Sequence, residues 1–158
     1  MWAGLDEGGM SILAAIDESE RSRTVAAIAA ELAAKYDDTL VALHVVPNED
    51  FEKHRAAVES IGKFQSYSFT QEESSAERFA REFVQESVDD FDVDDFEARG
   101  RIGDVTEEIL AEAASLEPRF LVISGRRRSP SGKAVFGNTA QQVLLGADCP
   151  VVTKLSDD

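Results

Sequence analysis

Residues 11–16 read Ser-Ile-Leu-Ala-Ala-Ile, which is a short and nearly continuous apolar run. A strand that is covered on both faces has this composition, whereas a strand with one face in water alternates apolar and polar residues. The run is therefore predicted to be a central strand of a parallel sheet. It decides the fold class, because a parallel sheet needs covering helices on both of its faces.

The rest of the sequence alternates between helical and strand-like patterns. Helical segments repeat apolar residues every three or four positions, and the strands are short apolar or alternating runs. The predicted helices are 19–36, 70–88, 104–116 and 138–146, and the predicted strands are 11–16, 40–46, 92–100, 120–123 and 150–153. Caps are predicted at Thr70, Asp104 and Asn138, each with a suitable partner three residues later. Segment 47–69 is left open, apart from a short helix near 51–61.

Strands that alternate with helices favour right-handed crossovers within one parallel sheet. The predicted fold class is α/β, in a three-layer, doubly wound (Rossmann-like) arrangement. Such a sheet binds its ligand at the carboxyl ends of the strands, where the winding reverses. We expect one domain over 10–158, preceded by a frayed leader at 1–9 that is rich in Gly and acidic residues.

Charge and composition exclude several classes of partner. The chain has 31 acidic and 16 basic side chains and a formal charge of -15, which disfavours nucleic acid or an anionic membrane. The same acidic excess suits a cell interior at high salt, which we state as a halophile hypothesis. The sequence shows no run of about 18 apolar residues and no secretory signal, and Cys149 has no second cysteine to pair with. A cytoplasmic location is expected.

The stretch Ser124–Thr139, after the fourth predicted strand, has the composition of a phosphate cradle. Its glycines leave room for backbone amides near a ligand, and the N-terminus of the following helix adds partial positive charge. The 30 residues from Pro118 to Ala147 contain no Asp or Glu, where the overall composition predicts about six. A phosphate site explains this gap, and a flexible basic loop is the alternative.

This stretch matches neither of two common nucleotide-binding motifs. A Walker A motif needs a glycine where Arg127 stands and a hydroxyl residue where Ala134 stands, and the sequence contains no GxGxxG. P-loop hydrolysis and a dinucleotide fingerprint are therefore not supported. No general base is identifiable from the sequence.

Four segments together resemble one protein family over residues 10–154. They are Ile12–Ser19, Leu43–Val46, Gly103-Asp104 with the helix that follows, and Gly125–Thr139. In these segments the sequence is similar to the universal stress protein family. The last one resembles the family's ATP signature, which has a Gly, two residues, a Gly, nine residues and then Gly-Ser or Gly-Thr. Here Arg128 replaces the second Gly, eight residues and not nine separate it from Gly137, and Asn138 replaces the hydroxyl residue.

The resemblance implies strand order 3-2-1-4-5 and a nucleotide-binding regulatory protein of the stress response with little or no catalysis. It implies ATP as the ligand, with AMP or ADP as alternatives and Mg²⁺ as a companion ion. Asp17 and Val45 would contact the base, and the Gly125–Thr139 stretch would contact the phosphates. The expected ligand residues are Ala15, Asp17, Val45, Ser124, Gly125, Arg126, Arg128, Gly132, Gly137, Asn138 and Thr139. The resemblance also implies a homodimer through the last strand, here Pro150–Lys154.

Other interpretations remain open at this point. The chain could be a family member that no longer binds ATP and acts as a protein interaction module. It could also be a slow ATPase or a phosphoryl- or adenylyl-transfer enzyme on the same fold. Asp17 could cap the helix at 19–36 as well as contact a base. We interpret His44, His54 and Cys149 as structural residues, and the acidic run 89–95 as a solvated turn and not a cation site.

Overall fold

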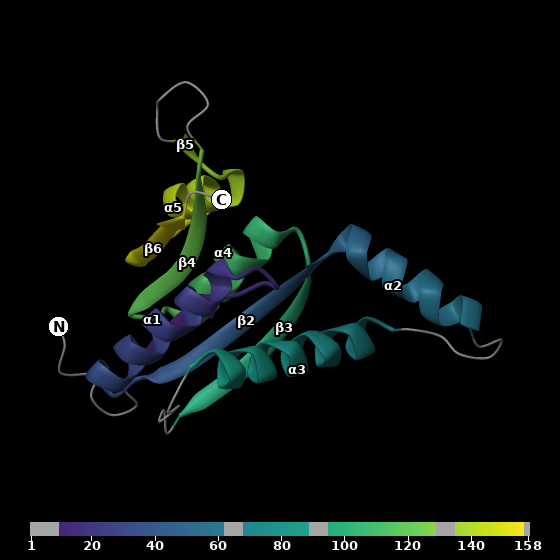
Figure 1. Ribbon diagram of the computed structural model, residues 1–158, viewed down its shortest axis with the longest axis horizontal. Helices are drawn as coiled ribbons and strands as arrows, with labels where there is room; N and C mark the ends of the chain where they lie inside the picture. The colour runs from purple at the N-terminus through teal and green to yellow at the C-terminus, as the bar shows by residue number, and fades with distance from the viewer. Residues whose placement is uncertain (1–9, 62–67, 89–94, 129–134, 157–158) are drawn as a thin grey trace.

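The computed structural model describes residues 10–61, 68–88, 95–128 and 135–156 (Figure 1). The side chains of residues 127, 128, 135 and 136 are not described. The predicted leader at 1–9, Gly132 and most of the acidic run at 89–95 lie outside the described residues. The fold and the candidate site are built from the remaining segments.

Five parallel strands form the main sheet, and β1 (Ser11–Ala15) lies at its centre. It pairs with β2 (Thr39–Pro47) on one side, with Ser11 opposite Thr39, and with β4 (Phe120–Arg128) on the other. The edges are β3 (Phe96–Gly103), next to β2, and β6 (Val151–Ser156), next to β4. With β6 counted as the fifth parallel strand, the predicted order 3-2-1-4-5 is confirmed. The winding reverses between β1 and β4.

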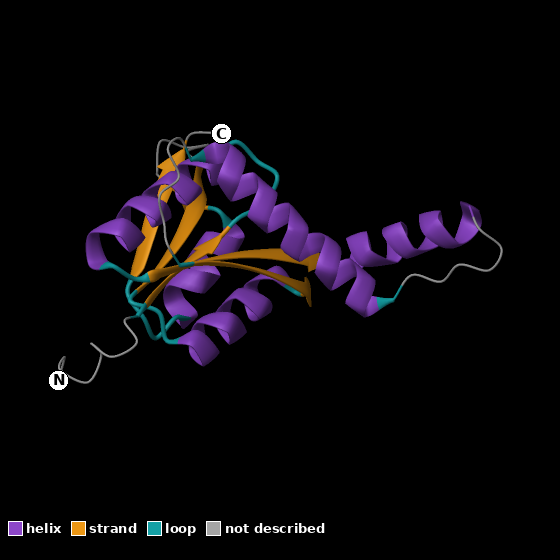
Figure 2. Ribbon diagram, turned by 90° about the horizontal axis from the view of Figure 1, so that it is seen from below, coloured by secondary structure: helices purple, strands orange, loops and turns teal. Residues whose placement is uncertain are grey.

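Helices cover both faces of this sheet, as the apolar run at 11–16 requires (Figure 2). Ile12 and Ala14 contribute to a core beneath α1 (Arg21–Tyr36) and α3 (Phe69–Ser87). Leu13, which points the opposite way, contributes to a second core beneath α4 (Val105–Leu116) and α5 (Asn138–Gly146). All three side chains are fully buried, which confirms the three-layer α/β class.

A helix that the sequence left mostly open, α2 (Asn48–Ile61), extends away from the sheet (Figures 1 and 2). It is anchored near its start by Phe51, which is buried in a small cluster with Val46, Ala76 and Ile102. The rest of α2 is mostly exposed, and Ile61 at its end is 85% exposed. The helix is therefore held to the domain by its first two turns.

The start of α3 corrects the predicted cap at Thr70. The N-cap is Ser68, whose hydroxyl accepts a hydrogen bond from the Gln71 amide at 3.2 Å, while Gln71 Oε1 accepts one from the Ser68 amide at 2.8 Å. This capping box starts the helix one residue earlier than predicted and places Glu72 in the first turn. It also places Phe69 against Phe51, with ring centroids 4.9 Å apart.

Two strand predictions also need correction. The edge strand expected at 92–100 is β3, which runs from Phe96 to Gly103, because it pairs with β2 over that whole length. The stretch expected to be a ligand loop begins instead as strand, because β4 continues to Arg128 with β6 beside it as far as Arg126. A short antiparallel partner, β5 (Val135–Phe136), then returns along the end of β4.

Candidate functional site: a cavity at the winding reversal

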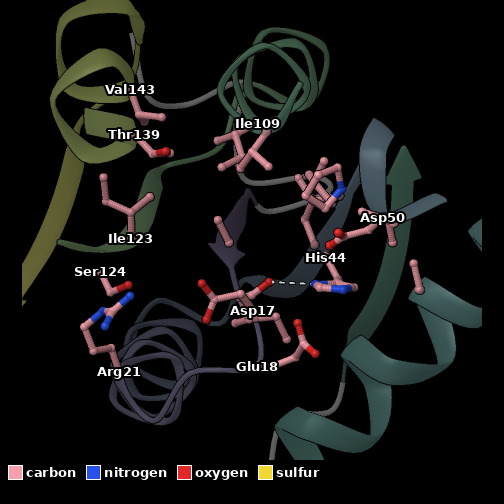
Figure 3. A pocket seen from close by; sticks show the side chains of 18 of the residues that line it. Asp17, Glu18, Arg21, His44, Asp50, Ile109, Ile123, Ser124, Thr139 and Val143 are labelled. Carbon is pink, nitrogen blue, oxygen red and sulfur yellow. Dashed lines mark hydrogen bonds between the residues drawn. The ribbon is translucent and has the colours of Figure 1, made fainter. Parts of the chain in front are cut away.

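A cavity of about 670 Å³ opens at the carboxyl ends of β1, β2 and β4, where the winding reverses. Its volume lies within the range of roughly 300–1,000 Å³ that is usual for small-molecule sites. On one side is the β4–α5 wall, which consists of Ser124, Gly125, Arg126, Gly137, Asn138 and Thr139. On the other is the α2–α3 wall, which consists of Asp50, His54, Glu72, Ser75, Ala76 and Phe79. Figure 3 shows side chains from both sides around Asp17.

The structure brings most of the predicted ligand residues to this cavity. Nine of the eleven line it, namely Ala15, Asp17, Val45, Ser124, Gly125, Arg126, Gly137, Asn138 and Thr139. Gly132 lies outside the described residues. Arg128 ends β4, and its side chain is not described. Residues from three separate parts of the sequence therefore share one cavity.

Asp17 follows β1 and organises the turn into α1. Its Oδ1 accepts hydrogen bonds from the Ser19 amide at 2.8 Å, the Ser19 hydroxyl at 2.5 Å and the Ser22 hydroxyl at 2.9 Å. Burial raises the pKa of the Asp17 carboxyl, but these hydrogen bonds and the charge of Arg21 outweigh it, and the net pKa lies below the ordinary Asp value. Asp17 is thus a carboxylate at neutral pH.

The alternative role predicted for Asp17, a helix cap, takes a different form. The N-cap of α1 is Glu20, whose side chain makes no capping bond. Asp17 closes the preceding turn instead, through its bond to the Ser19 amide two residues later. All three hydrogen bonds reach Oδ1, so they do not occupy Oδ2.

The two described glycines of the β4–α5 wall differ in what requires them. A Cβ on Gly125 would lie 2.7 Å from Leu155 Cδ2 and 3.2 Å from Ala140 Cβ, so Gly125 allows β6 and α5 to pack closely on β4. A Cβ on Gly137 would lie 3.6 Å from the nearest atom, the Arg126 amide nitrogen, which is an ordinary contact. Gly137 also has φ of -62°, which any residue adopts. A side chain at 125 would therefore force Leu155 and Ala140 to shift, whereas a Cβ at 137 would not displace a neighbour.

The start of α5 corrects the predicted cap at Asn138. The N-cap is Gly137, which has no side chain to accept a bond, and Asn138 is the first helical residue. The Asn138 side chain accepts a hydrogen bond from Gln142 Nε2 at 3.3 Å. The first turn of α5 contains no acidic residue and begins in the wall of the cavity. Its amides and partial positive charge therefore favour an anion there.

The α2–α3 wall contains a pair that the sequence did not reveal. His54 Nδ1 lies 2.9 Å from Glu72 Oε2, so the pair connects α2 to the first turn of α3. The Glu72 side chain is only 3% exposed, whereas that of His54 is 56% exposed. Glu72 Oε1 is buried and accepts no hydrogen bond from the residues that the structure describes. This wall is therefore acidic and depends on a contact between two helices.

His44, interpreted from the sequence as a structural residue, also lines the cavity. Its Nδ1 lies 3.1 Å from the Ile16 carbonyl oxygen, the hydrogen bond that Figure 3 marks. Because a carbonyl oxygen can only accept, Nδ1 is the donor of this bond. The imidazole packs beside Phe79, with centroids 4.4 Å apart. These contacts orient the ring at the end of β2.

Sequence reasoning missed Arg21, Asp50, His54 and Glu72 as lining residues. A signal existed for Arg21, because it stands four residues after Asp17 and begins the helix that follows the first strand. No comparable signal existed for the α2–α3 wall, because its partners are 18 residues apart in a segment with weak periodicity.

In the described ranges, no group of three or more His, Cys, Asp or Glu side chains is arranged to hold a metal ion. No helix in those ranges has the length and apolar composition needed to cross a bilayer. Cys149 is a partly buried free thiol, and burial raises its pKa above the usual value.

The family of this chain follows from a match over most of its length. The sequence model of the Universal stress protein family matches residues 10–153. The chain belongs to the universal stress protein family. A universal stress protein of Mycolicibacterium smegmatis is 43% identical over 58 residues, which cover 36% of this chain and 45% of that relative. The aligned part therefore spans less than half of the relative's length.

Solved structures of universal stress proteins share the fold. One from Archaeoglobus fulgidus superposes with a TM-score of 0.63 at 23% identity, over 91% of this chain and 97% of that one. A second structure from the same organism, described as a complex with dAMP, has a TM-score of 0.56 at 18% identity, over 92% of this chain and 98% of that one. At these identities the likeness establishes the common architecture.

Proposed function

We propose that this universal stress protein is a nucleotide-binding regulatory protein of the stress response, with an adenine nucleotide as its ligand. The observation that carries the proposal is the cavity at the winding reversal, which is lined by nine residues expected to bind a nucleotide. The dAMP complex of the A. fulgidus protein supports an adenine nucleotide as the ligand class. ATP is the proposed form, with ADP or AMP as alternatives and Mg²⁺ accompanying the phosphates.

The two ends of the proposed ligand suit different parts of the cavity. The base would lie near Ala15, Asp17 and Val45, where the Asp17 carboxylate can accept a hydrogen bond from an amino group. The phosphates would lie at the β4–α5 wall, which contains no acidic side chain and includes the start of α5. Arg128, the last residue of β4, and Gly132, which lies between β4 and β5 in the sequence, remain proposed contacts.

Calorimetric titration with ATP and Mg²⁺ tests this proposal. We expect saturable binding to the purified protein, and weaker binding to Gly137→Val, because the new side chain would occupy space at the start of α5, where a Cβ alone meets its neighbours at ordinary contact distance. Far-UV circular dichroism checks that the variant remains folded. Absence of binding at millimolar nucleotide would reject the proposal and favour the interaction module. Hydrolysis of ATP that disappears in Gly137→Val would favour the enzyme.

We further propose that the protein is a homodimer through β6. This strand is an edge of the sheet and pairs with β4 alone among the described strands. Val151 and Val152 are partly buried, which suits antiparallel pairing with a second copy. We expect Val152→Pro to be monomeric by light scattering, with circular dichroism as the check on folding. A folded variant that stays dimeric would contradict this interface.

The halophile hypothesis remains a proposal that rests on the formal charge of -15. Mutual repulsion among the acidic side chains should destabilise the fold when counterions are removed. We therefore expect the far-UV circular dichroism of the protein to decrease on dialysis into low salt. A spectrum that is indifferent to salt would count against the hypothesis.

A further inference from the structure

The charges that line the cavity pose a problem for a polyanionic ligand. Four described lining residues are acidic, namely Asp17, Glu18, Asp50 and Glu72. Only Arg21 and Arg126 among the described lining residues carry a permanent positive charge. The described lining is thus net negative when its histidines are neutral. Phosphates therefore need direct contact with a cation, in addition to the amides of α5.

Arg21 is better placed for such a contact than Arg126. It is the first residue of α1, and Figure 3 shows its side chain extending from that helix toward Ser124 in β4. Arg21 is partly buried, whereas Arg126 is exposed. A charge that is partly withdrawn from water interacts more strongly and is screened less by salt.

Arg21 also offsets the carboxylate that borders the same space. The Arg21 and Asp17 side chains interact electrostatically across the turn that joins β1 to α1. Without Arg21, an anion at the end of β4 would meet the uncompensated charge of Asp17. The guanidinium can reduce this repulsion and at the same time donate two parallel hydrogen bonds to phosphate oxygens.

We propose that Arg21 is a specificity-determining residue that binds the phosphate groups of the ligand from the α1 side of the cavity, opposite the start of α5. This inference rests on the proposed function, because it assigns a contact to the same nucleotide. Selectivity should follow the number of phosphates, since the contact is made to the phosphates and not to the base or the ribose. The affinity for a nucleoside, which has no phosphate, should not depend on Arg21.

The test compares Arg21→Gln with Arg23→Gln by calorimetry against ATP, AMP and adenosine. Arg23 is a matched control: it lies on the same helix, pairs with Glu20 at 3.1 Å and does not line the cavity. Both variants lower the net charge equally. We expect Arg21→Gln to weaken ATP binding roughly ten- to hundredfold, the usual loss for hydrogen bonds to a charged group. Adenosine binding should be unchanged, and Arg23→Gln should resemble the parent protein.

Two further measurements make the outcome decisive. The loss in Arg21→Gln should persist in 1 M KCl, where the Debye length is about 3 Å and only direct contacts act. Arg21→Lys should recover part of the ATP affinity, since Lys restores the positive charge but not the two parallel hydrogen bonds of a guanidinium. Equal ATP affinity in the parent and Arg21→Gln would overturn the inference while leaving the proposed function intact. A parent protein that binds none of the three ligands would overturn both.

Discussion

The β4–α5 wall and the α2–α3 wall face each other across one cavity, yet they are built in different ways. The first consists of residues from the second half of β4 and the start of α5, includes two glycines, and contains no acidic residue. The second consists of polar and apolar side chains from two helices, with Glu72 buried against the half-exposed His54. One wall depends on close packing and the other on a single pair.

This difference explains which wall was readable from the sequence. Residues Ser124–Thr139 are contiguous, and their glycines and missing carboxylates already indicate an anion site. Glu72 and His54 meet only because the cap at Ser68 sets the first turn of α3 and Phe51 anchors α2. A pattern within one segment can be predicted, whereas contact between residues of two different helices depends on tertiary packing.

The largest effect is expected from filling the close contact beneath the β4–α5 wall. Gly125→Val should lower the free energy of unfolding by about 2 kcal/mol or more, because its Cβ would clash with Leu155 and approach Ala140. Urea denaturation followed by circular dichroism measures the change. Gly137→Ala is the matched control and should cost less, about 1 kcal/mol or below, because it removes no packing and only replaces the N-cap glycine of α5 with a poorer capping residue. Equal urea midpoints for Gly125→Val and Gly137→Ala would show that close packing at Gly125 does not stabilise the β4–α5 wall.

The same contrast shows how far the fold could be predicted. The apolar runs at 11–16 and 40–46 correctly predicted central strands, because burial on both faces leaves a continuous pattern. The extension of β4 to Arg128 was missed, because polar arginines in that segment do not look like a strand. The neighbouring strand β6 supplies the pairing that the local composition does not suggest.

A smaller effect is expected at the α2–α3 wall. His54→Ala would leave the buried Glu72 carboxylate without its hydrogen-bond partner, at a cost of about 1 kcal/mol, because His54 is itself half exposed. Since α2 extends from the domain, the loss should appear as faster amide hydrogen exchange over Asn48–Ile61 with little change in the sheet. Arg55→Ala, on the exposed side of α2, is the control. Uniform exchange changes across the chain would argue against a locally held wall.

The double variant His54→Ala/Glu72→Leu sharpens this comparison further. Replacing the carboxylate removes the buried charge that the single variant leaves without a partner, so part of the lost stability should return. If the stability changes of His54→Ala and Glu72→Leu, each measured alone, simply added up in the double variant, the pair would not be coupled. The contact between α2 and α3 would then rest on the apolar cluster around Phe51.

The smallest effect is expected at Asp17, which lies between the two walls. Its pKa is lower in the folded protein than in the unfolded chain, so its charged form stabilises the fold above the ordinary Asp value of about 3.9 and this contribution fades as the pH falls below it. Asp17→Asn keeps an acceptor oxygen for Ser19 and Ser22 but cannot ionise. The parent should therefore be more stable than Asp17→Asn by about 0.5 kcal/mol or less at pH 7, since water still reaches Asp17, and the difference should be smaller at about pH 3. Urea titrations at both pH values measure this difference. If the stability of the parent relative to Asp17→Asn increased as the pH fell, burial, and not the hydrogen bonds from Ser19 and Ser22, would determine the pKa of the Asp17 carboxyl.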